Sequence, residues 1–128
     1  MGELRLILTV ADVDAALAVF RDALGLVQLE AWETGTSRGY RLAAGRATLE
    51  LADEGHAAEV DRLEVGHRVA GPVRVAFAVE DSAAAAERLV EAGVVRVSGP
   101  VATPWGDVNV RLQAPGGVQL TLFSGPPA

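Results

Sequence analysis

The sequence predicts an α+β fold made of two βαβββ modules in a chain of 128 residues. The main observation is an internal repeat, in which residues 5–22 read RLILTVADVDAALAVFRD and residues 74–91 read RVAFAVEDSAAAAERLVE. The offset is 69 residues both from Arg5 to Arg74 and from Asp12 to Asp81. A second observation is that three strand patterns follow each helical pattern. Because similarity at a constant offset is typical of repeated structural units, we expect two copies of one module.

Residues 3–53 are predicted to form the first module. Residues 4–10 alternate well enough for a strand, and Asp12 is placed to cap the helix after it. The apolar residues of this helix recur at i, i+3, i+4, i+7 and i+11, and they are Val13, Ala16, Leu17, Phe20 and Leu24. Gly25 is expected to end the helix. Strands at 26–33, 38–43 and 46–52 complete the module.

Residues 72–124 are predicted to repeat this order. A strand at 73–79 is followed by a helix over 82–92, which Gly93 ends, and by strands at 94–97, 108–113 and 118–123. Between the modules, residues 54–71 show little periodicity and are predicted to be a linker with some helix. We expect both modules and the linker to form one domain spanning residues 1–128.

Composition excludes several classes of protein. The chain has no cysteine, so it has no disulfide, no thiolate metal site and no cysteine nucleophile. A net charge of −6 without a basic cluster argues against a nucleic-acid partner. The sequence shows no signal-peptide pattern and no apolar run near the roughly 18 residues of a membrane span. We therefore expect a cytoplasmic protein with no membrane partner.

Four segments resemble a known family when they are taken in order. They are LTVADVDAALAVFRDALGL, ATLELAD, RVAFAVEDSAAAAERLVEAG and TPWGDVNVRLQAPGGVQLTLF. Together they resemble the vicinal oxygen chelate superfamily of glyoxalases, bleomycin resistance proteins and dioxygenases. The resemblance implies that the paired modules form a curved mixed sheet around a ligand cleft. One departure is Ala114, which stands where the family usually has an aspartate before the last turn.

The resemblance also identifies four positions where the family's enzymes hold a divalent metal through His and Glu side chains. Matched strand to strand, these positions are Arg5, Glu50, Arg74 and Thr121. Only Glu50 is a good ligand, because a guanidinium stays protonated and repels a cation. The chain therefore resembles a metal-free member, for which we expect neither metal nor cofactor.

Two interpretations of Arg5, Glu50 and Arg74 remain open. In the first, salt bridges among them replace the lost metal and hold the modules in register. In the second, one or both guanidinium groups bind a carboxylate or phosphate of a ligand, and Glu50 orients them.

Strand alternation and the aromatic residues extend this site. Alternation places Ile7, Thr9, Thr48 and Thr121 on the same inner face as the charged residues. Aromatic side chains suit a ligand site and equally suit an ordinary core, although Trp105 follows a proline in a turn and is expected to line the cleft. The candidate ligand-binding residues are Arg5, Ile7, Thr9, Trp32, Tyr40, Thr48, Glu50, Arg74, Trp105, Arg111 and Thr121.

Catalytic signals are weak. His56 and His67 both lie in the linker and are expected to be solvated loop residues. Glu50 is the one catalytic candidate, as a general base, but neighbouring arginines would lower its pKa and make it a poor base at neutral pH.

Three function classes follow from these observations. The favoured one is a metal-free protein that binds a small molecule, with sequestration of an antibiotic or natural product as one use. The alternative is a glyoxalase- or dioxygenase-like enzyme that uses an atypical metal site or Glu50 as a general base. The third is an interaction module without a small ligand. Exposed sheet edges also predict a homodimer.

Overall fold

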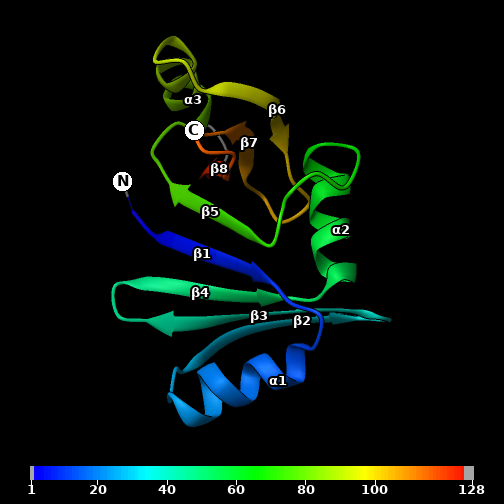
Figure 1. Cartoon of the computed structure of the whole chain (residues 1–128). Coiled ribbons are helices and arrows are strands. Elements are labelled where there is room, and N and C mark those ends of the chain that lie inside the picture. The colour runs from blue at the N-terminus through cyan, green and yellow to red at the C-terminus, as the bar shows by residue number, and fades with distance from the viewer. Residues whose placement is uncertain (1, 126–128) are drawn as a thin grey trace.

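Eight strands form one open, curved and mixed sheet whose outer face carries two helices (Figure 1). The structure is a computed structural model that describes residues 2–125. In chain order its elements are β1 (Leu4–Thr9), α1 (Val13–Leu17), η1 (Ala18–Ala23), β2 (Gln28–Thr34), β3 (Ser37–Ala44), β4 (Ala47–Ala52), α2 (Glu54–Glu64), β5 (Val73–Ala78), α3 (Ser82–Glu91), β6 (Val95–Ala102), β7 (Val108–Gln113) and β8 (Gln119–Ser124). This is the predicted α+β class, with the βαβββ order occurring twice.

The strand order of the sheet is β2-β3-β4-β1-β5-β8-β7-β6, which places the two halves back to back at β1 and β5. These two central strands are antiparallel, with Arg5 opposite Ala76 and Ile7 opposite Arg74. Each of them pairs in parallel with the last strand of its own half, β1 with β4 and β5 with β8. The register therefore relates the halves by an approximate twofold axis that passes between β1 and β5.

This axis makes several positions equivalent. Ile7 lies opposite Glu50 in the first half, as Ala76 lies opposite Thr121 in the second. In the next strand pair, Arg41 lies opposite Glu50 and Arg111 lies opposite Thr121. The register thus confirms the repeat that the sequence predicts. It makes Arg5 equivalent to Arg74, and Arg41 equivalent to Arg111.

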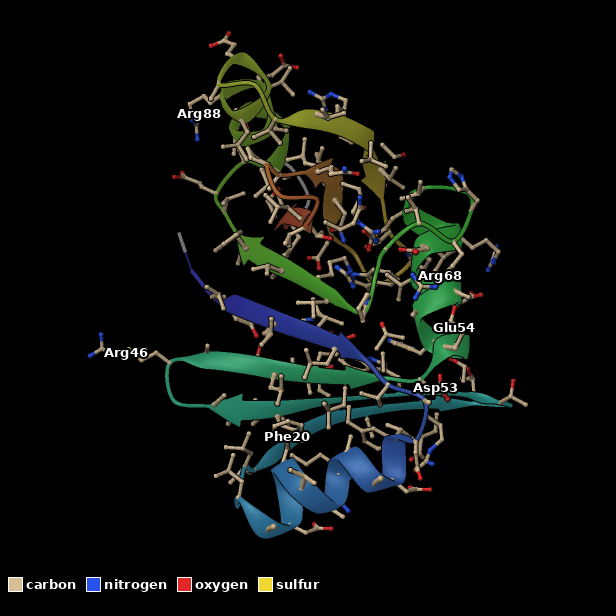
Figure 2. All side chains as sticks on the ribbon, viewed as in Figure 1. Phe20, Arg46, Asp53, Glu54, Arg68 and Arg88 are labelled. Carbon is tan, nitrogen blue, oxygen red and sulfur yellow. The ribbon has the colours of Figure 1, made fainter. Side chains whose placement is uncertain are left out.

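The outer face of the sheet is packed in two separate apolar clusters. Side chains from α1, β3 and β4 form the first, including Leu17, Leu42 and Leu51, and Phe20 of η1 packs against it (Figure 2). Side chains from α3, β7 and β8 form the second, including Ala86 and Leu112. Because successive side chains of a strand point to opposite faces, this packing turns the alternate residues of each strand toward the inner face.

The helices begin where the sequence predicts. The Asp12 carboxylate accepts a hydrogen bond from the backbone N–H of Ala15 at 3.0 Å, and Asp81 caps α3 in the same way through Ala84 at 3.1 Å. These caps satisfy a backbone donor that would otherwise lack a partner. They lie 69 residues apart, as Arg5 and Arg74 do. Within residues 2–125, no helix is both long and apolar enough to cross a membrane.

Three elements differ from the prediction. The first helix does not stay α-helical to Leu24, because the Leu24 N–H bonds to the Val19 carbonyl at 2.9 Å and closes a wider, π-type turn. The strand expected at 94–97 continues to Ala102 through Pro100, which an edge strand tolerates. The linker contains a full helix, α2, which Asp53 caps through the N–H of His56 at 2.8 Å.

Candidate functional site

The inner face of the sheet forms the floor of a cavity of about 410 Å³. The floor comes from the four central strands, β4, β1, β5 and β8, which carry residues of both halves. Its side chains are Arg5, Ile7, Glu50, Arg74, Ala76, Thr121 and Phe123. All four positions that the family resemblance identifies therefore meet in one cavity within a single chain.

Helix α2 forms one wall of this cavity. It contacts β3 and β4 in the first half and β6 and β7 in the second, so it bridges the two halves beside the floor (Figure 1). His56, Val60 and Glu64 line the cavity from successive turns of the same helix face. Residues after the helix return along it, and Arg68 pairs with Glu54 at 2.7 Å near the start of α2 (Figure 2).

The remaining walls come from the outer strands of each half. Glu30 and Trp32 extend from β2 on one side. On the other side, Trp105 and Asp107 lie in and beside the turn between β6 and β7. The side chain of Trp32 stacks on His56, with 5.7 Å between ring centroids and 18° between planes.

Gly39 makes the position of His56 possible. It lies opposite Trp32 in the β2–β3 pair, and the His56 ring packs directly over it. A Cβ at Gly39 would be 2.8 Å from both Cδ2 and Nε2 of His56, closer than real Cβ contacts allow. A side chain at this position would therefore displace the imidazole.

Glu50 is buried and already engaged on both carboxylate oxygens. Its Oε2 lies 3.6 Å from Arg5 Nη1, and its Oε1 lies 3.5 Å from His56 Nε2. Burial alone would raise the pKa of Glu50, but the His56 imidazole and the charges of Arg74 and Arg5 outweigh it, so the pKa lies below its usual value. Glu50 is therefore a carboxylate at neutral pH.

Arg74 is a buried cation of the site with a single hydrogen-bond partner in the described part of the chain. The residue is 9% exposed, and its Nη1 donates to the Thr121 hydroxyl at 2.7 Å. Among residues 2–125, no carboxylate lies within the 4.0 Å of an ion pair with this guanidinium. Burial, and then the charge of Arg111, lower the pKa of Arg74, while Glu64 and Glu50 act in the opposite direction. The predicted Arg5–Glu50 contact thus forms, but Arg74 does not join it.

A second charged network lies between α2 and β7. Arg111 is fully buried, with Nη1 at 2.6 Å from Asp61 and Nη2 at 2.9 Å from Glu64. Asp61 also accepts from the backbone N–H groups of Val69 and Ala70, both at 2.8 Å. Burial would raise the pKa of Asp61, but these hydrogen bonds and Arg111 bring it down to about 2. The network attaches α2 to the second half of the sheet.

Most of the predicted ligand-binding residues meet at the cavity. Seven of them line it, namely Arg5, Ile7, Trp32, Glu50, Arg74, Trp105 and Thr121. Thr9 borders a small adjoining hollow. Thr48 is buried beside Glu3, and Arg111 is buried in the network between α2 and β7. The structure corrects the expectation for Tyr40, which lies on the outer face, packs in the core under α1 and accepts a hydrogen bond from Arg38.

Sequence reasoning missed several lining residues. The expectation of a solvated loop residue is wrong for His56, which is mostly buried in α2, whereas His67 is exposed as expected. His56, Val60 and Glu64 recur every four residues after a capping aspartate, so a helical interpretation of residues 53–64 would have placed them on one face. Asp107 and Asn109, which follow Trp105, also line the cavity. For Asn109, the alternation of residues along the predicted strand at 108–113 was the signal that could have placed it on the inner face.

The four positions do not fit a divalent cation. The Arg5 guanidinium contacts the one carboxylate among them, and Arg74 donates to Thr121. Two cations in this space would repel a metal ion, and a hydroxyl is a weak ligand. Within residues 2–125, no three His, Cys, Asp or Glu side chains gather in a way that could hold a metal.

Comparisons with known proteins agree with this architecture. A family model described as the Glyoxalase/Bleomycin resistance protein/Dioxygenase superfamily matches residues 4–122. Among solved structures, a hypothetical protein from Bacillus halodurans has a TM-score of 0.71 at 16% identity, with 100% of this chain and 96% of that chain covered. Methylmalonyl-CoA epimerase from Streptomyces coelicolor, in complex with 2-nitronate-propionyl-CoA, has a TM-score of 0.68 at 19% identity, with 99% of each chain covered.

A superfamily member from Vibrio splendidus has a TM-score of 0.63 at 14% identity, with 97% of this chain and 99% of that chain covered. No curated protein matches the sequence. At these identities the structural similarity shows the fold alone.

Proposed function

Because the chain belongs to the Glyoxalase/Bleomycin resistance protein/Dioxygenase superfamily, we propose that it binds a small organic anion in the cavity between its halves, without the divalent metal of the superfamily's enzymes. The observation that carries this proposal is Arg74, a buried cation that lines the cavity with one hydrogen bond and no ion pair among the described residues. A guanidinium has five N–H donors, and those of Arg74 that do not bond to Thr121 are left to the cavity, because no Arg74 nitrogen is both sealed from solvent and without a partner within residues 2–125. A ligand carboxylate would satisfy them with two parallel hydrogen bonds.

The surroundings of Arg74 support binding of an anion rather than closure by the protein itself. Glu50, which could have paired with Arg74, is engaged by Arg5 and His56. Glu64, on the helix above, is engaged by Arg111 and Asn109. Each of these two carboxylates thus has another partner. We therefore expect a ligand to supply the counter-ion of Arg74.

The second candidate, an enzyme with Glu50 as general base, is supported by the position of His56 beside Glu50 in the cavity. It is disfavoured because the pKa of Glu50 lies below its usual value, whereas an effective base has a pKa near the operating pH. Sequestration of an antibiotic or natural product is the finer form of the binding proposal, and it rests on the resemblance to bleomycin-binding members. The homodimer and the cytoplasmic location stay predictions.

Isothermal titration calorimetry with ring-containing monocarboxylates and their neutral amides tests the proposal. We expect the acids to bind and their amides to bind at least about tenfold more weakly, because a charged hydrogen-bonded pair contributes about 1.5–3 kcal/mol. Arg74→Met should remove this preference for the acids. Arg46→Met is the matched control, because Arg46 extends from the exposed β3–β4 turn, away from the cavity (Figure 2). Acids and amides that bind equally, or an Arg74→Met variant that retains acid binding, would contradict the proposal.

A further inference from the structure

We propose that the anion bound at Arg74 is the single carboxylate of a flat, unsaturated ring system, and that Trp32 and Trp105 contact its ring from the two halves of the protein. This inference rests on the proposed function, because it assigns the chemical class of the ligand for the same cavity. It follows from the placement of the aromatic side chains, from their support and from the charge balance around Arg74.

Aromatic residues are scarce in this chain and are divided between two places. There are six of them, two tryptophans, one tyrosine and three phenylalanines. Phe20, Tyr40 and Phe77 pack in the outer clusters under the helices. The other three, Trp32, Trp105 and Phe123, line the cavity. Half of the aromatic residues, including both tryptophans, are therefore available to a ligand rather than to the helix-covered core.

Two of the three rings are held in place by a neighbour. The Trp32 ring stacks on the His56 imidazole, and the Phe123 ring centroid lies 5.4 Å from the Arg5 guanidinium carbon. Supported rings present a preorganised surface, so a ligand does not have to order them when it binds. They come from opposite halves, with Trp32 on β2 and Phe123 on β8.

Trp105 has no comparable structural task. It lies in the turn between β6 and β7 and is 50% exposed, although it lines the cavity. An indole left half in water is not used for core packing, and large exposed aromatic residues are typical of binding surfaces. A flat ring bound over the floor would cover it, which supplies the burial that the protein alone does not.

The charges around Arg74 favour one carboxylate over a phosphate ester. The negative charges of Glu64, Glu50 and Asp61 already favour the charged form of this guanidinium. A dianion would meet these carboxylates across a poorly solvated space, where like charges repel strongly. A monoanion is enough to neutralise Arg74, and a cavity of about 410 Å³ is within the usual range for organic ligands.

Calorimetry with four probes tests the inference: 2-naphthoate, its saturated analogue decahydro-2-naphthoate, 2-naphthamide and 2-naphthyl phosphate. We expect 2-naphthoate to bind about tenfold more tightly than the saturated acid, because each aromatic contact adds to the burial of apolar area. The amide and the phosphate ester should bind more weakly than 2-naphthoate. Trp105→Leu and Trp32→Leu should each reduce the ratio between the two acids and leave the binding of the saturated acid nearly unchanged.

Leu24→Ala is the control, because Leu24 is a largely exposed apolar residue that does not line the cavity. Trp105→Leu keeps the test valid if Trp32→Leu fails to fold, since the Trp105 side chain is half exposed in a turn. Equal affinity for the two acids, or a ratio that neither variant changes, overturns the inference and leaves the anion site intact. If neither acid binds, the proposed function fails together with the inference. Tighter binding of the phosphate ester overturns the assignment of a monocarboxylate.

Discussion

Arg5 and Arg74 occupy equivalent positions in the two halves of the sheet, yet their surroundings are opposite. Arg5 has a side chain that is 23% exposed, and it contacts both Glu3 and Glu50. Arg74 is buried and has Thr121 as its hydrogen-bond partner. The difference arises because Glu50 in the first half corresponds to Thr121 in the second. A repeat can therefore keep a cation at both places and pair only one of them with carboxylates among the described residues.

Helix α2 extends this asymmetry. It lies between the modules and contacts strands of both halves. It supplies Asp61 and Glu64 to Arg111, whereas the equivalent Arg41 pairs with Glu30 and Glu3 near the surface. At its other end, His56 packs over Gly39, while the position equivalent to Gly39 is Asn109, which donates to Glu64 at 3.1 Å. One helix is thus held by an aromatic contact in one half and by buried charges in the other.

The largest effect is expected from breaking the buried network. Arg111→Met should lower the free energy of unfolding by about 3 kcal/mol or more, because it leaves the buried Glu64 carboxylate without its cation and Asp61 with Arg68 as its remaining ion-pair partner. Arg41→Met is the matched control in the other half and should cost about 1 kcal/mol, because its partners Glu30 and Glu3 are both partly exposed. Urea unfolding of both variants measures the difference. Equal losses would mean that α2 does not distinguish the halves energetically.

A smaller effect is expected from the pH dependence of the same network. The pKa of Asp61 in the folded state, about 2, lies below its unfolded value of 3.8, so its contribution is fully present above about pH 4. That contribution is about 2 kcal/mol and is lost as the pH falls toward 2. The difference in stability between the wild type and Asp61→Asn should therefore shrink between pH 5 and pH 2, as followed by chemical denaturation.

Glu59→Gln is the control for this pH series. Glu59 pairs with Arg62 on the exposed side of α2, at 2.6 Å. Its substitution should leave stability nearly unchanged at every pH, because exposed ion pairs contribute little. An Asp61→Asn difference that stays constant from pH 5 to pH 2 would argue against a carboxylate held by buried hydrogen bonds.

Gly39→Ala tests the other attachment of α2, which is the packing of His56 over Gly39 in the first half. The new methyl group would collide with His56, so we expect a loss of about 1 to 2 kcal/mol and a changed tryptophan emission as the stack on Trp32 is disturbed. Gly71→Ala is the control, because a Cβ there would meet no atom of the described residues within 4 Å. Unfolding curves and fluorescence spectra of both variants provide the measurement. Unchanged emission in Gly39→Ala would show that the His56 ring has room to move.

The smallest effect concerns the two equivalent arginines themselves. Arg74→Met should leave the free energy of unfolding unchanged or raise it by up to about 1 kcal/mol, because it removes a buried charge without an ion-pair partner among the described residues. Arg5→Met should lower it by roughly 0.5–1 kcal/mol, because the Glu3 and Glu50 contacts are lost. Thermal and urea unfolding compare the two. A marked destabilisation by Arg74→Met would indicate a structural role for Arg74 and would argue against the proposed anion site.

Local patterns predicted most of the fold. Alternating apolar residues and capping aspartates are local signals, so the strands and the helix starts at Asp12 and Asp81 followed from the sequence. Residues 53–64 were harder to interpret, because α2 is polar along much of its length and buries Asp61 and Glu64 instead of an apolar stripe. A helix held by ion pairs lacks the periodicity by which helices are usually found.

The sequence by itself determined the repeat, the superfamily resemblance and the presence of two arginines at positions where a metal would be repelled. It also brought Arg5, Glu50, Arg74 and Thr121 to one inner face, because strand alternation has a fixed period. Only the tertiary structure decided which arginine is paired, why Tyr40 is in the core and that His56 lies in the cavity. The physical reason is that charge pairing depends on distances between residues far apart in the chain, such as the 2.6 Å between Arg111 and Asp61.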